Sequence, residues 1–200
     1  MAGGARAFTA VLTRPDGQSD ALASQLADAG CDVLEFPLID IAPVDDPAPL
    51  DAAFAALADY ALVIFVSPNA IDRALARYGA IWPNALPVGV VGPGSVAALE
   101  RHGIAAPAHR VIAPQAPADG GVPHYDSESL FASIDAAFGG AQALAGERVL
   151  IVRGDGGREW LAERLREAGA DVTLVAAYRR VVPEPRVGAW ERVHALLDGQ

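Results

Sequence analysis

The sequence predicts an α/β fold built on a mainly parallel sheet. Short apolar runs rich in β-branched residues alternate along the chain with helical patterns of about ten residues, and this alternation is typical of βαβ units. A segment near the N-terminus also recurs in the second half of the chain, which indicates an internal duplication.

The N-terminal elements are a strand, a helix and an extended segment. Phe8 to Thr13 reads as a strand, and Arg14-Pro15-Asp16-Gly17 reads as the turn after it. Ser19 to Ala29 has helical periodicity, and Gly30 supplies the stop. Val33 to Val44 is extended but interrupted by prolines, so we expect an edge strand or a connector.

The middle of the chain repeats a strand–turn–helix unit. Leu50 to Ala58 predicts a helix with Phe54 and Leu57 on its apolar side. The continuous apolar run Leu62 to Val66 predicts a buried strand, followed by a helix that ends at Arg77. Val88 to Val91 predicts a short strand, followed by a helix that ends at Gly103.

The C-terminal part continues the alternation. A loop rich in glycine and proline from Asp119 to Asp126 precedes a helix that opens at Ser127. Arg148 to Val152 predicts a strand, followed by a helix to Ala168 and an extended segment from Asp171 to Val182.

The internal repeat keeps one offset through a turn, a helix, a stop and a strand start. Leu22-Ala23-x-x-Leu26-x-x-Ala29-Gly30-x-Asp32-Val33 matches Leu161-Ala162-x-x-Leu165-x-x-Ala168-Gly169-x-Asp171-Val172, so the offset is 161 − 22 = 139. Arg14-x-Asp16-Gly17 matches Arg153-x-Asp155-Gly156 at the same offset.

The repeat also predicts a longer second half. The first copy is followed by two further strand–loop–helix units, whereas the second is followed only by Val187 to Leu197. By the repeat, roughly 50–60 more residues are expected, so the sequence reads as a fragment or as a chain whose tail lies outside it.

Composition excludes several classes of protein. The formal net charge is −10 and there is no lysine, so a nucleic-acid partner is not expected. No apolar run is long enough to span a membrane, and no signal peptide precedes the first strand, so a cytosolic protein is the default. Cys31 is the only cysteine and the four histidines are scattered, so no metal site is expected.

Four loops share the pattern of a strand, a tight turn of small residues and a helix start. They are Arg14-Pro15-Asp16-Gly17, Ser67-Pro68-Asn69-Ala70, Gly92-Pro93-Gly94-Ser95 and Arg153-Gly154-Asp155-Gly156-Gly157. Helix starts at the carboxyl ends of parallel strands suit anions. The alternative is that Ser67, Asn69 and Ser95 only cap their helices.

Common catalytic motifs are absent. Gly92-x-Gly94 lacks the third glycine of a dinucleotide fingerprint, a P-loop is impossible without lysine, and Gly-x-Ser-x-Gly does not occur.

From about Phe8 to Pro185 the chain resembles the uroporphyrinogen-III synthases. The motifs that carry the resemblance are Leu12-Thr13-Arg14-Pro15, Phe65-Val66-Ser67-Pro68-Asn69-Ala70, Val91-Gly92-Pro93-x-Ser95, Tyr125-Asp126-Ser127-Glu128-x-Leu130, Arg153-Gly154-x-Gly156-Gly157-Arg158 and Ala177-Tyr178-Arg179-Arg180. Each motif is weak, but their order and spacing together are specific.

The resemblance implies two flavodoxin-like lobes joined by two extended crossings, with the active site in the cleft between them. The crossings would be Leu38 to Val44 and Ala177 to Val182. Residues 1–39 with 178–200 would form a discontinuous lobe, incomplete at its C-terminus, and residues 40–177 would form the inserted lobe.

The resemblance also implies an activity: a lyase of haem biosynthesis that closes linear hydroxymethylbilane to uroporphyrinogen III with inversion of ring D, without metal or coenzyme. Tyr178 matches the family's tyrosine and would help the hydroxyl leave, unless it only packs at the crossing. Arg14, Ser67, Asn69, Gly92, Ser95, Arg153, Gly154 and Arg158 would bind the eight carboxylates of the substrate. The complete protein would be a monomer.

Two alternatives stay open at this point. A two-lobed module that closes on an anion without chemistry would fit the same fold. A folded but inactive fragment would fit the expected missing tail.

Overall fold

The computed structural model describes residues 8–116, 121–184 and 187–198. Its contacts divide the chain into two units. Unit 1 comprises Met1–Ala42 and Arg180–Gln200, and unit 2 comprises Pro43–Arg179.

Unit 1 contains a small parallel sheet. Strand β1 (Thr9–Leu12) pairs with β2 (Asp32–Glu35), and helix α1 (Asp20–Asp28) connects them. Strand β3 (Asp40–Ala42) and helix α7 (Ala189–Leu197) complete the described elements of this unit. No residue of α1 is buried, so its apolar positions contribute little to a core within the described residues.

Unit 2 is organised by a parallel sheet whose strands are β4 (Tyr60–Phe65), β5 (Val88–Val90), β6 (Val111–Ile112), β7 (Arg148–Gly154) and β8 (Asp171–Val181). The order of these five strands is β8-β7-β4-β5-β6. The pairings of β4 with β5 and β7, of β5 with β6, and of β7 with β8 are all parallel. Strands β5 and β6 therefore lie on one side of β4, and the later strands β7 and β8 lie on its other side.

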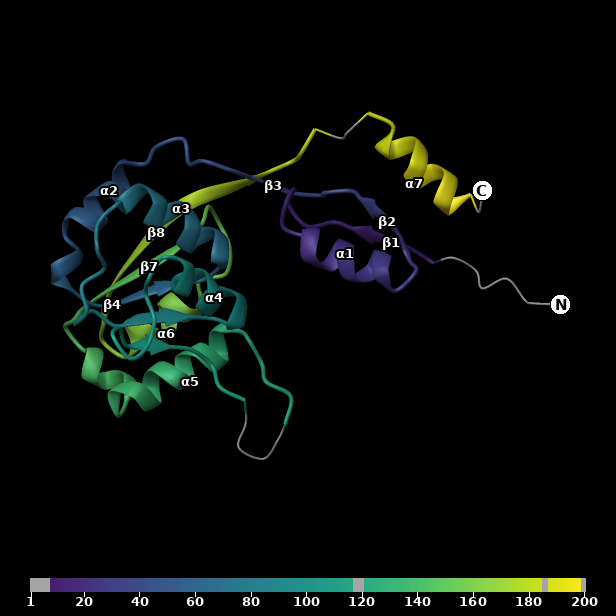
Figure 1. Cartoon of the computed structure of the whole chain (residues 1–200). Coiled ribbons are helices and arrows are strands. Elements are labelled where there is room, and N and C mark those ends of the chain that lie inside the picture. The colour runs from purple at the N-terminus through teal and green to yellow at the C-terminus, as the bar shows by residue number, and fades with distance from the viewer. Residues whose placement is uncertain (1–7, 117–120, 185–186, 199–200) are drawn as a thin grey trace. The chain divides into compact units, whose positions relative to one another are not determined.

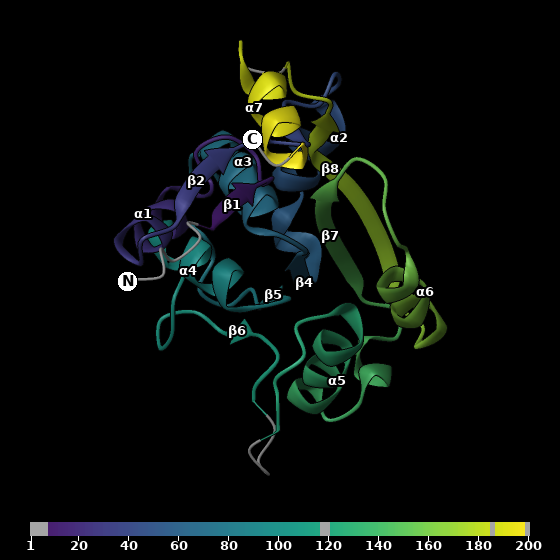
Figure 2. The same ribbon diagram turned by 90° about the vertical axis from the view of Figure 1, so that its right-hand side faces the viewer.

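Helices cover both faces of the unit 2 sheet (Figures 1 and 2). They are α2 (Ala48–Ala55), α3 (Pro68–Tyr78), α4 (Pro93–Arg101), α5 (Ser127–Phe138) and α6 (Trp160–Glu167). Two short 3-10 turns, Leu57–Asp59 and Ala141–Leu144, precede β4 and β7.

The unbroken apolar run of β4 is explained by burial on both faces. Leu62 and Ile64 pack with Leu130 of α5 and Leu165 of α6 in one cluster. Because side chains alternate along a strand, neighbouring residues of β4 face the opposite side. There the Phe65 ring lies 5.9 Å from the ring of Trp82, centroid to centroid.

The structure confirms the predicted α/β class and the mainly parallel sheet. The expected elements are present with bounds shifted by a few residues, and the two-residue strand β6 was not predicted because it is too short to show a period.

The sequence repeat is also a structural repeat. The β1–β2 pairing begins with Thr9 opposite Asp32, and the β7–β8 pairing begins with Arg148 opposite Asp171. Both pairs are related by the sequence offset, since 9 + 139 = 148 and 32 + 139 = 171. The turn glycines correspond too, with φ of 72° at Gly17 and 68° at Gly156, so the duplicated turn keeps its left-handed conformation.

Candidate functional site

The candidate site lies at the carboxyl ends of β4, β5 and β7 in unit 2. The strand order reverses between β4 and β7, and such a switch point is where open α/β sheets bind ligands. Helices α3, α4 and α6 begin in the loops that follow these three strands. Their first-turn N–H groups have no acceptor within the helix, so this edge favours anions.

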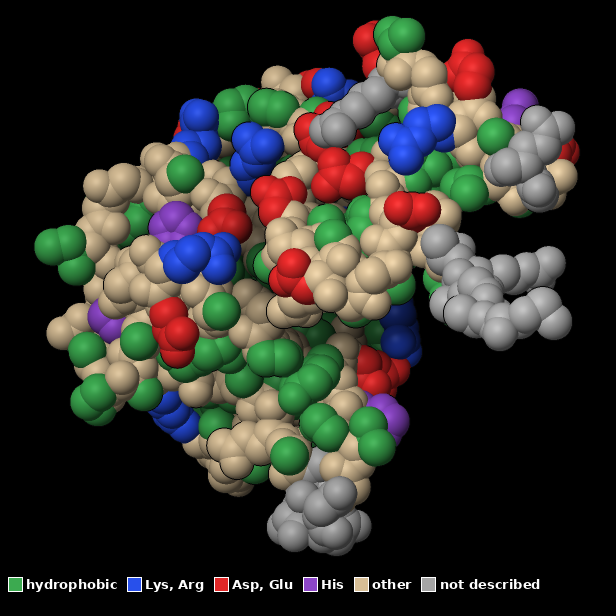
Figure 3. Space-filling view, turned by 45° about the vertical axis from the view of Figure 1, so that its right-hand side comes forward, with side chains coloured by type: hydrophobic (Ala, Val, Ile, Leu, Met, Phe, Trp, Pro, Cys, Tyr) green, Lys and Arg blue, Asp and Glu red, His purple; other side chains and the backbone are tan. Residues whose placement is uncertain are grey.

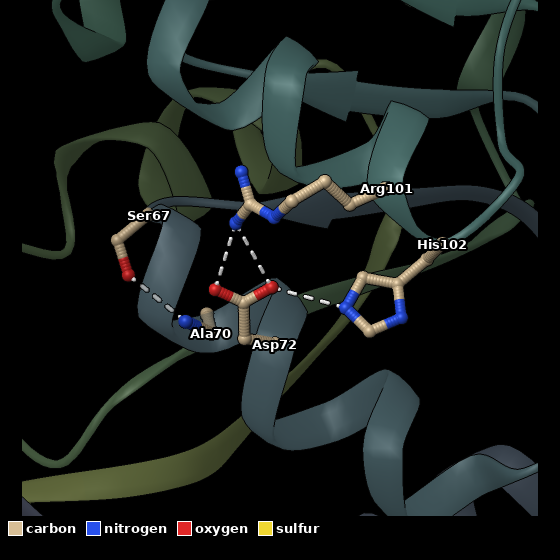
Figure 4. Close-up of polar contacts among 5 residues, drawn as sticks. All are labelled: Ser67, Ala70, Asp72, Arg101 and His102. Atoms are coloured by element: carbon tan, nitrogen blue, oxygen red, sulfur yellow. Dashed lines mark hydrogen bonds and ion pairs between the residues drawn. The ribbon is translucent and has the colours of Figure 1, made fainter.

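Ser67 joins the end of β4 to the start of α3. Its backbone is extended, with φ −161° and ψ 159°, and its side chain caps the helix. The Ser67 Oγ accepts a hydrogen bond from the Ala70 N–H at 3.1 Å (Figure 4). Pro68 occupies the first turn, where a missing N–H costs nothing. The sequence therefore fixes the orientation of the Ser67 hydroxyl locally.

Tyr178 reaches Ser67 from β8. The two hydroxyl oxygens lie 3.2 Å apart, and either group can donate the hydrogen bond. The Tyr178 side chain is almost fully buried, with a relative exposure of 2%. A buried phenol with a polar partner is held in one position, as a proton donor in a reaction must be.

Gly154 makes room for the Tyr178 ring. A Cβ at Gly154 would lie 2.7 Å from Tyr178 Cζ, closer than atoms tolerate. The register of β7 against β8 shifts between Arg153 and Gly154, so Arg153 pairs with Ala176 and Gly154 pairs with Tyr178. The Asp155 N–H then donates to the Tyr178 carbonyl oxygen at 2.7 Å. This irregularity at the end of β7 sets the position of the ring.

The start of α4 lies beside the start of α3. Gly92 holds the cap position of α4, and a Cβ at Gly94 would meet Pro68 Cγ at 3.7 Å. The interpretation of Ser95 and Asn69 as helix caps is wrong, because Gly92 and Ser67 occupy those positions. Ser95 lies in the first turn of α4 and is only 4% exposed, so its hydroxyl is covered.

A polar brace ties α3 to α4 further along. The Asp72 carboxylate of α3 accepts hydrogen bonds from Arg101 at 3.1 and 3.2 Å and lies 3.0 Å from His102 Nε2 (Figure 4). All three groups are partly exposed, so the brace contributes little free energy. It joins the end of α4, at Arg101 and His102, to the first half of α3.

The arginines of the site are engaged with nearby acceptors. Arg153 pairs with Glu159 at 3.0 Å and its side chain is 16% exposed. Arg158 pairs with Glu128 and is 61% exposed, and its guanidinium lies over the ring of Trp160. On the face shown in Figure 3, arginines are spread among acidic side chains. An anion at this edge would therefore meet mainly N–H groups and hydroxyls, and Arg158 is more accessible than Arg153.

A fifth loop, before α5, belongs to the same edge and was not assigned a role from the sequence. Asp126 caps α5 by accepting a hydrogen bond from the Ser129 N–H at 2.7 Å. Hydrogen bonds from the Ser129 backbone and side chain lower the pKa of Asp126 below 3.8, with smaller contributions from His124 and Arg158. The usable signal was the aspartate directly before the helical pattern, a standard cap residue. Tyr125 precedes it and lies against Gly92.

The structure brings most of the candidate residues together. Unit 2 places all but one of them at the carboxyl edge: Ser67, Asn69, Gly92, Ser95 and Arg158 in loops or first turns, Arg153 and Gly154 at the end of β7, and Tyr178 on β8. Arg14 follows β1 in unit 1 and is exposed. It is the counterpart of Arg153 in the repeat.

The described ranges contain neither a cluster of metal-binding side chains nor a helix that could span a membrane. No group of three or more histidine, cysteine, aspartate or glutamate side chains there is placed to hold a metal ion. None of the helices described is both long and apolar enough to cross a membrane.

Known proteins resemble this chain over nearly all of its length. The family model of uroporphyrinogen-III synthase HemD matches residues 20–199. A uroporphyrinogen-III synthase of Synechococcus elongatus is 33% identical over 180 residues, which are 88% of this chain and 61% of that protein. The Escherichia coli enzyme of the same name is 31% identical over 173 residues, covering 85% and 64% of the two chains. This chain thus spans less than two thirds of the length of these relatives.

A solved structure shows the same fold. The crystal structure of a mutant uroporphyrinogen III synthase from Thermus thermophilus superimposes with a TM-score of 0.55 at 20% identity. The match covers 96% of this chain and 69% of that one.

Proposed function

Because the chain belongs to the uroporphyrinogen-III synthase family, as the match over residues 20–199 shows, we propose that it cyclises hydroxymethylbilane to uroporphyrinogen III. The reaction inverts ring D and releases water, and it is a step of haem biosynthesis. The observation that carries the proposal is the hydrogen-bonded pair of Ser67 and Tyr178 at the strand-order switch point.

Tyr178 suits the first chemical step. As the bond between the terminal carbon and its hydroxyl breaks, both electrons go to oxygen, and a proton from the Tyr178 hydroxyl converts the leaving group to water. The pyrrole nitrogen lone pair stabilises the cation left behind. Ser67 keeps the Tyr178 hydroxyl in place, since the Ser67 Oγ is itself held by the Ala70 N–H. General acid help of this kind contributes roughly 10²–10⁴-fold.

The later steps need positioning more than acid–base chemistry. The substituted carbon of ring D attacks the cation and forms a spiro intermediate. That intermediate fragments and recloses with ring D inverted, and a proton is lost at the end. The bilane can also close without help to the uninverted isomer I, so the protein must hold one geometry in preference to another.

Substrate carboxylates would be held at the helix starts. We assign this role to the first turns of α3 and α4, with Asn69 and Gly92, and to the Arg158 guanidinium. Arg153 and Gly154 shape the β7–α6 loop, and the covered Ser95 supports the start of α4 by packing. Arg14 is the corresponding candidate in unit 1. Many moderate donors suit a flexible polyanion on a protein of net charge −10.

The same proposal includes the architecture of the family. We take the two units as two flavodoxin-like lobes joined by extended crossings at Leu38 to Val44 and Ala177 to Val182. The lobe bounds are then 1–39 with 178–200, and 40–177. A monomer that works in the cytoplasm without metal or coenzyme completes the proposal.

The test is a cyclisation assay with freshly prepared hydroxymethylbilane. The products are oxidised, and the type I and type III isomers are separated and compared with a protein-free control. We expect type III from the 200-residue chain. Type I alone, at the protein-free rate, from a chain that is folded by circular dichroism would overturn the enzyme proposal. Retained binding of the substrate in that case would favour a non-catalytic anion-binding module.

A further inference from the structure

Tyr125 is a half-exposed aromatic side chain at the carboxyl edge of the unit 2 sheet, with a relative exposure of 47%. One side of the ring lies against the backbone of Gly92. A Cβ at Gly92 would meet the Tyr125 Cβ and Cγ at 3.2 Å and Cδ1 at 3.4 Å. The absence of a side chain at Gly92 therefore lets the ring pack on the start of α4.

The other three tyrosines are engaged with protein groups. The Tyr60 hydroxyl bonds Arg148, the Tyr78 ring contacts Phe54 and Trp82, and the Tyr178 hydroxyl bonds Ser67. Within the described ranges, the Tyr125 hydroxyl has no hydrogen-bond partner and its ring has no aromatic neighbour. An amphipathic ring left without partners beside a ligand-binding edge is suited to contact a ligand.

A continuous line of contacts connects Tyr125 to the reacting end of the site. Tyr178 bonds Ser67, and Ser67 precedes Pro68 in the chain. Pro68 lies beside Gly94 of the α4 start, and Gly92, two residues before Gly94, contacts the Tyr125 ring. The starts of α3 and α4 thus connect Tyr178 and Tyr125 in one strip of residues.

The strip matches the chemistry of the substrate. Helix starts and hydroxyls serve carboxylates, but four flat pyrrole rings also need apolar contact. We infer that Tyr125 is a substrate-binding residue whose ring packs on a pyrrole ring of the bilane, distant from the ring that loses its hydroxyl. This inference rests on the proposed function and adds a contact that sets affinity rather than rate.

The inference separates binding from chemistry. A contact far from the breaking bond stabilises the bound substrate and the transition state equally, so its loss raises KM and leaves kcat unchanged. Removing an aromatic pair costs roughly 3- to 10-fold in affinity. Tyr125→Phe keeps the ring, Tyr125→Leu keeps only the apolar cover over Gly92, and Tyr125→Ala keeps neither.

The experiment measures kcat, KM and the thermal midpoint of the full chain and of these three variants. Binding of uroporphyrin III, the oxidised product with its eight carboxylates, is followed by fluorescence anisotropy. We expect KM and the uroporphyrin Kd to rise roughly 3- to 10-fold in the leucine and alanine variants, with kcat within about twofold and the phenylalanine variant close to wild type.

Two outcomes would contradict the inference, and a third would contradict the proposed function. A leucine variant that binds like wild type would show that the ring only covers Gly92. A fall in kcat without a rise in KM would place Tyr125 in the chemistry or in the fold. If the unmutated chain forms no type III product, the proposed function fails instead, and the uroporphyrin titration still reports whether Tyr125 binds the tetrapyrrole.

Discussion

The hydroxyl oxygens of Ser67 and Tyr178 lie 3.2 Å apart although the residues are separated by 111 positions in the chain. Ser67 follows β4 and caps α3, and Tyr178 lies on β8, which is two strands away from β4 in the sheet. Strand β7 lies between them, and its last residue, Gly154, has no side chain to block the Tyr178 ring. The pair is therefore a product of strand order and of one glycine.

Removal of the Tyr178 hydroxyl tests its assigned role as proton donor. We expect Tyr178→Phe to lower kcat by on the order of 10²-fold or more while the chain stays folded, because the ring still fills its place. Tyr60→Phe is the matched control: Tyr60 is also buried, but it begins β4 at the opposite end of that strand. Equal rates for the two variants in the isomer assay would remove Tyr178 from the chemistry.

Substitution of Gly154 should act through the Tyr178 ring. A Cβ would lie 2.7 Å from Tyr178 Cζ, so we expect Gly154→Ala to destabilise the fold by about 1–3 kcal/mol, as overpacking does. The same change in a Tyr178→Ala background should cost far less, because the obstructing ring is gone. Gly94→Ala is the control, since its Cβ would meet Pro68 at an ordinary 3.7 Å.

Urea unfolding of the wild type, Gly154→Ala, Tyr178→Ala and the double variant gives the coupling free energy between the two positions. If Gly154→Ala costs the same with and without the Tyr178 ring, the contact is not the reason for glycine at this position.

Ser67 has two hydrogen bonds to lose. Ser67→Ala removes the helix cap on Ala70 and the contact with Tyr178, and we expect it to cost about 1 kcal/mol of stability and to lower kcat. Ser67→Thr retains a hydroxyl that can cap and should recover most of the stability. Chemical denaturation and the isomer assay on both variants check this. A threonine variant as unstable as the alanine variant would contradict the capping role.

The cap on α5 should depend on pH. The pKa of Asp126 is lower in the folded chain than its usual 3.8 because the ionised carboxylate accepts hydrogen bonds from Ser129. A lowered pKa means that the stabilisation is present above 3.8 and is lost as the pH falls through the folded value. We expect Asp126→Ala to be less stable than wild type at pH 7.

The stabilities of the wild type and of Asp126→Ala should then converge as the pH is lowered below about 4. Thermal melts between pH 3 and pH 7 measure the difference. A gap that stays constant over this range would mean that the charge of Asp126 plays no part in the cap. Asp126→Asn keeps a good cap residue but does not titrate at this position, so its stability difference from Asp126→Ala should stay constant over this pH range.

Local sequence was sufficient wherever neighbouring residues decide the conformation. Turn glycines, the cap at Ser67 and the apolar run of β4 all have short-range causes, and they appear in the structure as expected. The 139-residue offset also relates the register of β1 against β2 to that of β7 against β8, because the same turn and helix connect the two strands in each copy. The capping interpretation failed at Ser95, a good cap residue that lies within the first turn of α4 because Gly92 holds the cap position.

The sequence by itself determined the α/β alternation, the duplication and the helix-start loops that follow the strands. Only the tertiary structure decided that β7 inserts beside β4, that Tyr178 meets Ser67 and that Tyr125 lies on Gly92. The reason is physical: periodicity and capping are set by residues three or four positions apart. Parallel strand order is set by contacts between distant segments, and no local pattern encodes which strand lies next to which.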